Sequence, residues 1–168
     1  MGIILRQRII VDWNKCSGCR VCEFVCSLVN EGAFNPVKSR IKVIRTWAEG
    51  LIHSVPVFCL QCEDAYCQKI CPVRAISRNE KGVLIVNEAR CIGCKLCEMA
   101  CPVGGINVDP EKHVALKCEE CARIGGDPQC VKYCFDGALQ FVTSEKVGYA
   151  VARARLEKFK ELVMKGVT

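Results

Sequence analysis

Long apolar runs are absent from this 168-residue chain. No stretch approaches the roughly 20 apolar residues that a membrane-spanning helix needs. The first fifteen residues, MGIILRQRIIVDWNK, hold only short apolar runs that Arg6, Arg8 and Asp12 interrupt. They do not resemble the apolar segment of a secretory signal peptide. We therefore expect a cytoplasmic protein that does not insert into a membrane.

Motifs of catalysis and nucleotide binding are also absent. The glycine pairs at 104–105 and 125–126 lack the strand-and-helix context of a nucleotide-binding loop. Serine, histidine and carboxylate residues do not fall into a recognisable nucleophilic motif. The chain has two histidines, His53 and His113, which we expect at the surface or in hydrogen bonds. The sequence predicts no catalytic site.

Cysteine is abundant, at sixteen of 168 residues. Without cysteine the apolar content falls to about 42%, slightly low for a globular domain. Something other than aliphatic packing should therefore help to order the chain. In a reducing cytoplasm, clustered cysteines bind metals more often than they form disulfides.

The cysteines form four groups of four, with none left over. Groups one and three, CSGCRVCEFVC and CIGCKLCEMAC, share the pattern V-D/N-x-x-K/R-C-x-G-C-x-x-C-x-x-x-C. Groups two and four, CLQCEDAYCQKIC and CEECARIGGDPQCVKYC, widen the gap before the third cysteine. A repeat this regular indicates duplicated modules.

The spacing distinguishes between metals. Zinc sites usually combine two distant C-x-x-C pairs. The run C-x₂-C-x₂-C-x₃-C-P is the bacterial ferredoxin signature, in which the fourth cysteine ligates the neighbouring cluster. Group three matches this run through Pro102. Sixteen thiolates thus predict four [4Fe–4S] clusters, with zinc or disulfides as the alternatives.

The charge of the chain is consistent with clusters. Its formal net charge is +6, and four oxidised clusters with their thiolates would bring the total to about −2. The basic residues are scattered among the cysteines, so we expect no nucleic-acid partner. Six of them adjoin or lie close to cysteines and are either cations that raise cluster potentials or solvated surface residues: Lys15, Arg20, Arg90, Lys95, Lys117 and Arg123.

Local patterns predict short elements around the cysteines. Strands are expected at 8–11, 40–45, 82–86, 114–116 and 139–143. The stretch FNPVKS predicts a turn. Each C-x-x-x-C pair should begin a short helix, and the cysteine-free tail at 145–165 has the apolar spacing of a helix. That helix would pack on its own domain or dock to a partner.

The pairing of the groups remains open from the residues alone. Because fourth ligands cross over, the groups must work in pairs. Group one can pair with two and three with four. Alternatively, two and three form a pair nested inside one and four.

The four groups, together with NPVKSRI, CEDAYCQKICPVRAI and VALKCEEC, carry a family resemblance over residues 8 to about 144. The chain resembles the four-cluster ferredoxin-like subunits of multisubunit oxidoreductases. These include subunits of dimethyl sulfoxide reductase, formate dehydrogenase, carbon monoxide dehydrogenase and tungsten aldehyde oxidoreductase type enzymes. The resemblance implies the nested pairing, with the ligand sets Cys16, Cys19, Cys22 and Cys134; Cys118, Cys121, Cys130 and Cys26; Cys59, Cys62, Cys67 and Cys101; and Cys91, Cys94, Cys97 and Cys71.

The resemblance also implies an α+β fold of two nested bacterial two-cluster ferredoxin-like modules with a C-terminal helix. We expect one domain at 1–144, with an outer module at 1–50 and 105–144 and an inner module at 51–104. A helical tail would follow at 145–168. Ser27 and Phe135 stand where the family often has proline after the fourth cysteine, so the outer module departs from the pattern.

The implied function is non-catalytic electron transfer. The chain would relay single electrons to or from a large catalytic subunit of the tungsten- or molybdenum-pterin or carbon monoxide dehydrogenase type. A soluble ferredoxin or another electron carrier would be a further partner. The alternatives are a free-standing polyferredoxin and, from a different class, a zinc-binding interaction module.

Overall fold

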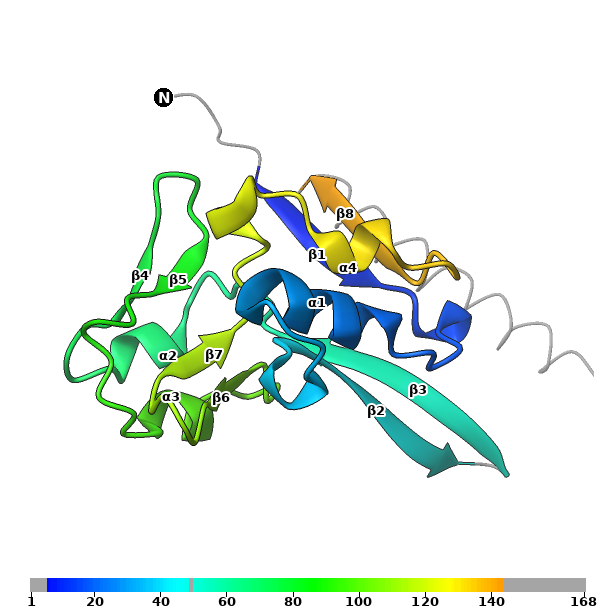
Figure 1. The fold of residues 1–168 in the computed structure, drawn as a ribbon, viewed down its shortest axis with the longest axis horizontal. Coiled ribbons are helices and arrows are strands. Elements are labelled where there is room, and N and C mark those ends of the chain that lie inside the picture. The colour runs from blue at the N-terminus through cyan, green and yellow to red at the C-terminus, as the bar shows by residue number, and fades with distance from the viewer. Residues whose placement is uncertain (1–5, 49, 144–168) are drawn as a thin grey trace, which may run out of the picture.

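The computed structural model describes residues 6–48 and 50–143 (Figure 1). Its strands form four antiparallel pairs. β1 (Gln7–Val11) pairs with β8 (Leu139–Thr143), and β2 (Ile41–Ala48) pairs with β3 (Leu51–Phe58). β4 (Ile76–Arg78) pairs with β5 (Leu84–Val86), and β6 (Ile106–Val108) pairs with β7 (Ala115–Lys117). The mixture of small helices and strand pairs confirms the α+β ferredoxin-like fold class.

The helices follow the cysteine groups. They are α1 (Val21–Glu31), α2 (Tyr66–Lys69), α3 (Leu96–Met99) and α4 (Gln129–Lys132), and each contains the third cysteine of one group. Among these four described helices, only α1 exceeds one turn. It ends at Gly32, whose φ of 71° lets its N–H bond to the carbonyl of Leu28. The expected short helices are confirmed.

Three short 3₁₀ turns complete the described elements: η1 (Trp13–Lys15), η2 (Pro36–Lys38) and η3 (Ala122–Ile124). The turn expected in FNPVKS is η2. There the Asn35 side chain accepts a hydrogen bond from the N–H of Val37, and Pro36 takes the first position.

All five expected strands are present, as β1, β2, β5, β7 and β8. β8 has the expected bounds, and the bounds of the other four differ by up to three residues. Sequence reasoning missed their partners β3, β4 and β6. The tail helix expected at 145–165 lies outside the described residues. Among the helices of 6–48 and 50–143, none has the length and apolar character needed to cross a membrane.

Two hydrophobic cores organise the fold. The first contains Ile9, Cys22, Ile41, Val43, Phe58, Cys130 and Leu139. The second contains Ala65, Ile76, Leu84, Val86, Cys97, Ile106, Val108 and Ala115. Cysteine belongs to both, so positions that a larger protein would fill with aliphatic side chains are taken by thiols.

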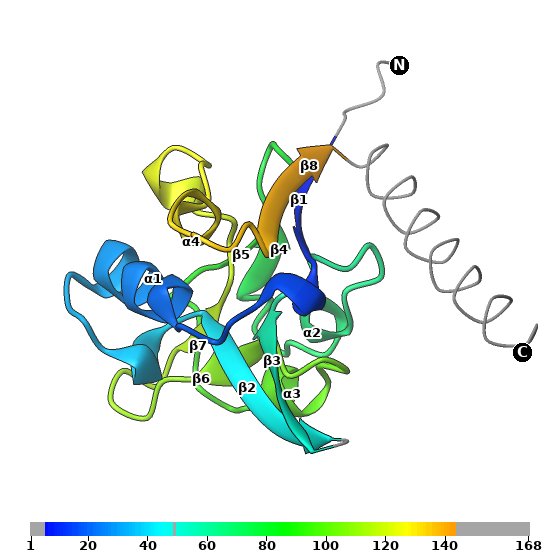
Figure 2. The ribbon, with the colours of Figure 1, turned by 90° about the vertical axis from the view of Figure 1, so that its right-hand side faces the viewer.

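Distant parts of the chain meet beside the first core. Helices α1 and α4 lie side by side, and β1 pairs with β8 near the other end of the described chain (Figures 1 and 2). The β2–β3 hairpin is the longest strand pair and extends away from the body. The contact between α1 and α4 and the pairing of β1 with β8 bring cysteine groups one and four together.

Candidate functional site

The sixteen cysteines line four separate cavities. We call them cavity A (Cys16, Cys19, Cys22, Cys134), cavity B (Cys26, Cys118, Cys121, Cys130), cavity C (Cys59, Cys62, Cys67, Cys101) and cavity D (Cys71, Cys91, Cys94, Cys97). Their volumes are about 320, 400, 370 and 330 Å³, counting the part that opens to solvent.

Each cavity takes three cysteines from one group and one from its partner group. Groups one and four share cavities A and B, and groups two and three share cavities C and D. These are the four sets that the family resemblance implies. Ligation itself stays a prediction, since it concerns bonds to iron.

The loops around the cysteines turn backbone N–H groups toward sulfur. Left-handed residues occur in all four C-x-x-C loops, including Gly18, Gln61, Gly93 and Glu120. Six main-chain N–H groups donate to cysteine sulfurs at 3.3 to 3.4 Å, from Arg40, Gln61, Ala75, Gly105, Ala115 and Glu120 to Cys26, Cys59, Cys71, Cys101, Cys91 and Cys118 respectively. Such bonds stabilise a thiolate that ligates metal and tune the redox potential of its cluster.

Glycine allows one close approach between the two halves of cavity C. Gly105 follows group three and lies against the backbone at the start of group two. A Cβ at this position would come within 2.6 Å of the carbonyl oxygen of Phe58 and 2.7 Å of the nitrogen of Cys59. The same residue donates its N–H to Cys101. A side chain here would therefore separate Cys101 from the other cysteines of its cavity.

Burial makes the free thiols hard to ionise. It raises the pKa of Cys22 and of Cys118 to about 12 and that of Cys97 to about 11, with repulsion from neighbouring thiolates adding to the effect at each. The pKa of Cys130 is raised further by the same causes. All sixteen are free cysteines. Metal binding must release these protons, so the thiolate form depends on the metal.

The donor set fits an iron–sulfur cluster. A single zinc ion holds four sulfurs at about 2.3 Å. Within residues 6–48 and 50–143, no group of three or more His, Cys, Asp or Glu side chains is close enough together to hold one metal ion. Each cavity is nevertheless lined by four soft thiol donors, and backbone N–H groups bond to several of the sulfurs. These features suit a group with several irons, each taking one cysteine.

The cavities adjoin in the order A, B, C, D. Cys22 of cavity A and Cys26 of cavity B lie on the same helix, α1. Phe58 lines cavity B and the next residue, Cys59, lines cavity C. Cys97 of cavity D lies in α3, which ends just before Cys101 of cavity C. The two exposed cysteines, Cys19 and Cys94, belong to the end cavities A and D.

The six basic residues near the cysteines differ in environment. Lys15, Arg20, Arg90 and Lys95 are exposed, although Arg20 lines cavity A and Lys95 lines cavity D. Arg123 pairs with Glu119 and Glu88. Lys117 is buried and lines cavity C. The interpretation as solvated surface residues therefore suits these four exposed residues better than it suits Lys117.

Two polar residues at the cavities were missed by sequence reasoning. Arg40 lines cavity B and is buried against Asn30, Glu31 and Glu119. Gln61 is buried between groups two and four, where its amide bonds to the backbone of Leu84 and Cys118. No local pattern distinguishes them from surface residues. The expectation that His53 and His113 are surface residues is confirmed, since both are exposed.

Comparison with known families identifies related proteins. Residues 51–144 match the family described as 4Fe-4S dicluster domain. The polyferredoxin-like subunit of aliphatic sulfonate oxidoreductase from Pyrococcus furiosus is 41% identical, over 80% of this chain and 77% of the relative. The electron transport protein HydN of Escherichia coli is 37% identical, over 90% of this chain and 96% of the relative.

A solved structure shares the fold. It is a chain of the active site complex BamBC of benzoyl coenzyme A reductase, with a TM-score of 0.51 and 24% sequence identity. The match covers 90% of each chain. At this identity the likeness concerns the fold alone.

Proposed function

Because the chain belongs to the family of 4Fe-4S dicluster, ferredoxin-like electron-transport subunits, we propose that it relays single electrons through four [4Fe–4S] clusters. One cluster would lie in each of cavities A, B, C and D. The observation that carries this proposal is the division of sixteen cysteines into four cavities with four thiols each. A dicluster family assignment alone would require only two clusters.

The ligand sets are those of the cavities. Cys16, Cys19, Cys22 and Cys134 would hold the cluster in A, and Cys26, Cys118, Cys121 and Cys130 the one in B. Cys59, Cys62, Cys67 and Cys101 would hold the cluster in C, and Cys71, Cys91, Cys94 and Cys97 the one in D. Each bound cluster supplies a one-electron redox centre. The chain's own residues space the centres, exclude water and donate hydrogen bonds to sulfur.

The relay order follows the row of cavities. An electron that enters at A would pass B and C and leave at D, or travel in the opposite direction. Support comes from the chain itself, which joins cavities A and B through helix α1, B and C through Phe58 and Cys59, and C and D through α3 and Cys101. The exposed Cys19 and Cys94 would bring the end clusters near the surface, where partners exchange electrons.

A large catalytic oxidoreductase subunit is the proposed partner. Relatives include the subunit of aliphatic sulfonate oxidoreductase and an electron transfer subunit of thiosulfate reductase. The tungsten- or molybdenum-pterin type is our choice among such subunits, and the chain itself would be non-catalytic. The cytoplasmic location is proposed on the basis of cysteine usage. The nested two-module organisation is likewise a proposal, supported by the two separate cores.

The test is anaerobic purification of the full chain from its native source, followed by metal and sulfide analysis. We expect about 16 iron and 16 sulfide per chain, uptake of four electrons in a reductive titration, and a large pterin-containing subunit in the same fraction. Four zinc ions without sulfide would refute the relay and favour the interaction module. A fully loaded chain that purifies alone would instead support the free polyferredoxin.

A further inference from the structure

Lys117 differs from the other lysines of the described structure by its burial. Its side chain is among the largest fully buried ones in the described structure, and the residue is only 1% exposed. It ends β7 and directly precedes Cys118. A lysine is rarely buried to this extent without a partner of opposite charge, so its surroundings require an explanation.

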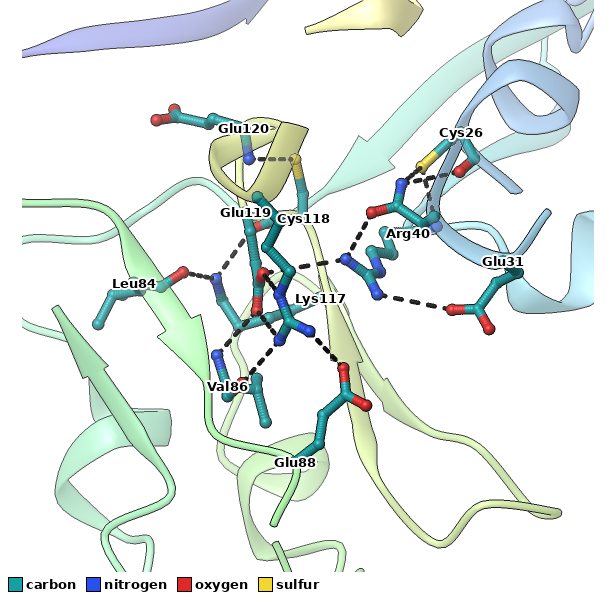
Figure 3. Close-up of polar contacts among 12 residues, drawn as sticks. Cys26, Glu31, Arg40, Leu84, Val86, Glu88, Lys117, Cys118, Glu119 and Glu120 are labelled. Atoms are coloured by element: carbon teal, nitrogen blue, oxygen red, sulfur yellow. Dashed lines mark hydrogen bonds and ion pairs between the residues drawn. The ribbon is translucent and has the colours of Figure 1, made fainter. Parts of the chain in front are cut away.

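The ammonium group of Lys117 has two neutral partners. Its Nζ donates to the carbonyl oxygens of Leu84 at 2.5 Å and Cys118 at 2.8 Å (Figure 3). Within residues 6–48 and 50–143, no carboxylate lies within 4.0 Å of this nitrogen. The neighbouring buried acid Glu119 is instead occupied by Arg123, Arg40 and the N–H of Val86. The other neighbouring buried acid, Glu120, lies 3.6 Å from Arg8 and attracts Lys117 only from beyond 4.0 Å. The positive charge is thus held by hydrogen bonds and has no direct ion-pair partner.

This charge lies between two cavities. Lys117 lines cavity C beside Cys59, Cys67 and Cys101. Its carboxyl-side neighbour Cys118 belongs to cavity B. The lining of cavity B also contains a buried cation, Arg40, but Glu119 and Glu120 offset its charge. The lining of cavity C contains Lys117 and no carboxylate.

The duplicated cysteine groups allow equivalent positions at cavities B and C to be compared. Phe58 precedes the first cysteine of group two and lines cavity B. Lys117 precedes the first cysteine of group four and lines cavity C. Equivalent positions of the repeat therefore give one inner cavity an aromatic ring and the other a buried cation.

We propose that Lys117 raises the reduction potential of the cluster in cavity C, so that this position has the highest potential in the relay. Reduction adds one negative charge to a cluster, and a cation in a low-dielectric site favours that charge more strongly than one in water. The inference rests on the proposed function. With the highest potential, the cluster in cavity C would be the internal site of the relay where an electron resides between transfers.

The experiment is a potentiometric titration of the full chain in which electron paramagnetic resonance monitors the reduction of each cluster. Lys117→Met removes the charge and the hydrogen bonds, and Lys117→Gln removes the charge but retains an N–H donor. We expect the most positive of the four reduction waves to move to lower potential in both variants. The wave of the adjoining cluster in cavity B should move less, and the other two should stay in place.

Two further variants serve as controls. Lys117→Arg keeps the charge and should leave the waves near their original positions. Lys95→Met removes an exposed cation that lines cavity D. Its smaller shift should vanish in about 1 M salt, where the Debye length is about 3 Å. The shift from the Lys117 variants should persist because the site is buried.

Three outcomes would overturn the inference. The waves of both neutral variants could coincide with those of the wild type, or Lys95→Met could produce an equal, salt-resistant shift. Failure of both neutral variants to bind iron, while Lys117→Arg loads fully, would give Lys117 a folding role instead. Iron and sulfide are measured on every sample first, so a wild type without about 16 iron identifies failure of the proposed function itself.

Discussion

Removal of iron by an anaerobic chelator is expected to unfold the chain rather than leave an empty fold. Within residues 6–48 and 50–143, every sheet has only two strands, and three of the four helices are single turns. Elements of this size are not stable alone in water. Both cores include cysteines, and without metal the buried thiols of Cys22, Cys97 and Cys130 would lose their links to the other ligands. Metal-binding energy is therefore folding energy in this protein.

Far-UV circular dichroism of the full chain provides the measurement. The helix and strand signal should fall together with the visible absorbance as iron is removed. Addition of iron and sulfide under reducing conditions should restore both, which controls for damage by the chelator. A chain that keeps its dichroism after complete loss of iron would contradict the account.

The second large effect is expected from Glu119→Ala. The carboxylate of Glu119 accepts hydrogen bonds from the N–H of Val86 at 2.8 Å and from Nε of Arg123 at 2.7 Å, and it lies 3.9 Å from Arg40 (Figure 3). Its side chain is 3% exposed and that of Arg40 is 7% exposed. Removal leaves Arg40 with Glu31 as its remaining ion-pair partner. Breaking a buried pair of this kind costs about 3–5 kcal/mol.

Clusters lost in denaturant do not re-form without added iron and sulfide, so unfolding is irreversible under these conditions. The readout is therefore the rate at which cluster absorbance bleaches in denaturant. We expect Glu119→Ala to bleach between about 100-fold and about 4,000-fold faster than the wild type, since 1.4 kcal/mol is tenfold. The matched control is Glu88→Ala, because Glu88 pairs with the same Arg123 but is 45% exposed. Exposed pairs contribute up to about 1 kcal/mol, so this variant should bleach within about fivefold of the wild type. Equal rates for the two variants would show that the buried network does not hold the fold together.

The cysteine spacing predicted the local structure well because its rules are local. A C-x-x-x-C pair places two thiols about one helical turn apart, and the structure has a helix at the third cysteine of every group. The strands with β-branched or alternating residues were also predicted. β5 is a continuous apolar run, whereas β4 and β6 have a polar residue, Ser77 or Asn107, at the centre of three. β3 contains Pro56, which argues against a strand. Their strand character depends on pairing with partners elsewhere in the chain.

Long-range features could not be read from the residues alone. Spacing left two pairings of the cysteine groups open, since either joins one group of each kind. The environment of Arg40 and Lys117 depends on packing between distant segments: Lys117 bonds to Leu84, and Arg40 to Asn30 and Glu119. The module boundaries at 50/51 and 104/105 stay a prediction. In the structure β3 contributes Phe58 to the first core, and β6 and β7 contribute to the second.

The central claim is that four clusters occupy cavities A to D with four cysteines each. Anaerobic crystals of the full chain, measured at the iron absorption edge, test it most directly. The account predicts four separate iron peaks in a row, each bonded to the four cysteines of one cavity. Three results would contradict it. Only two iron peaks could be present, or the peaks could be absent at the iron edge and present at the zinc edge. Alternatively, Cys26 and Cys134 could bind the cluster of their own group.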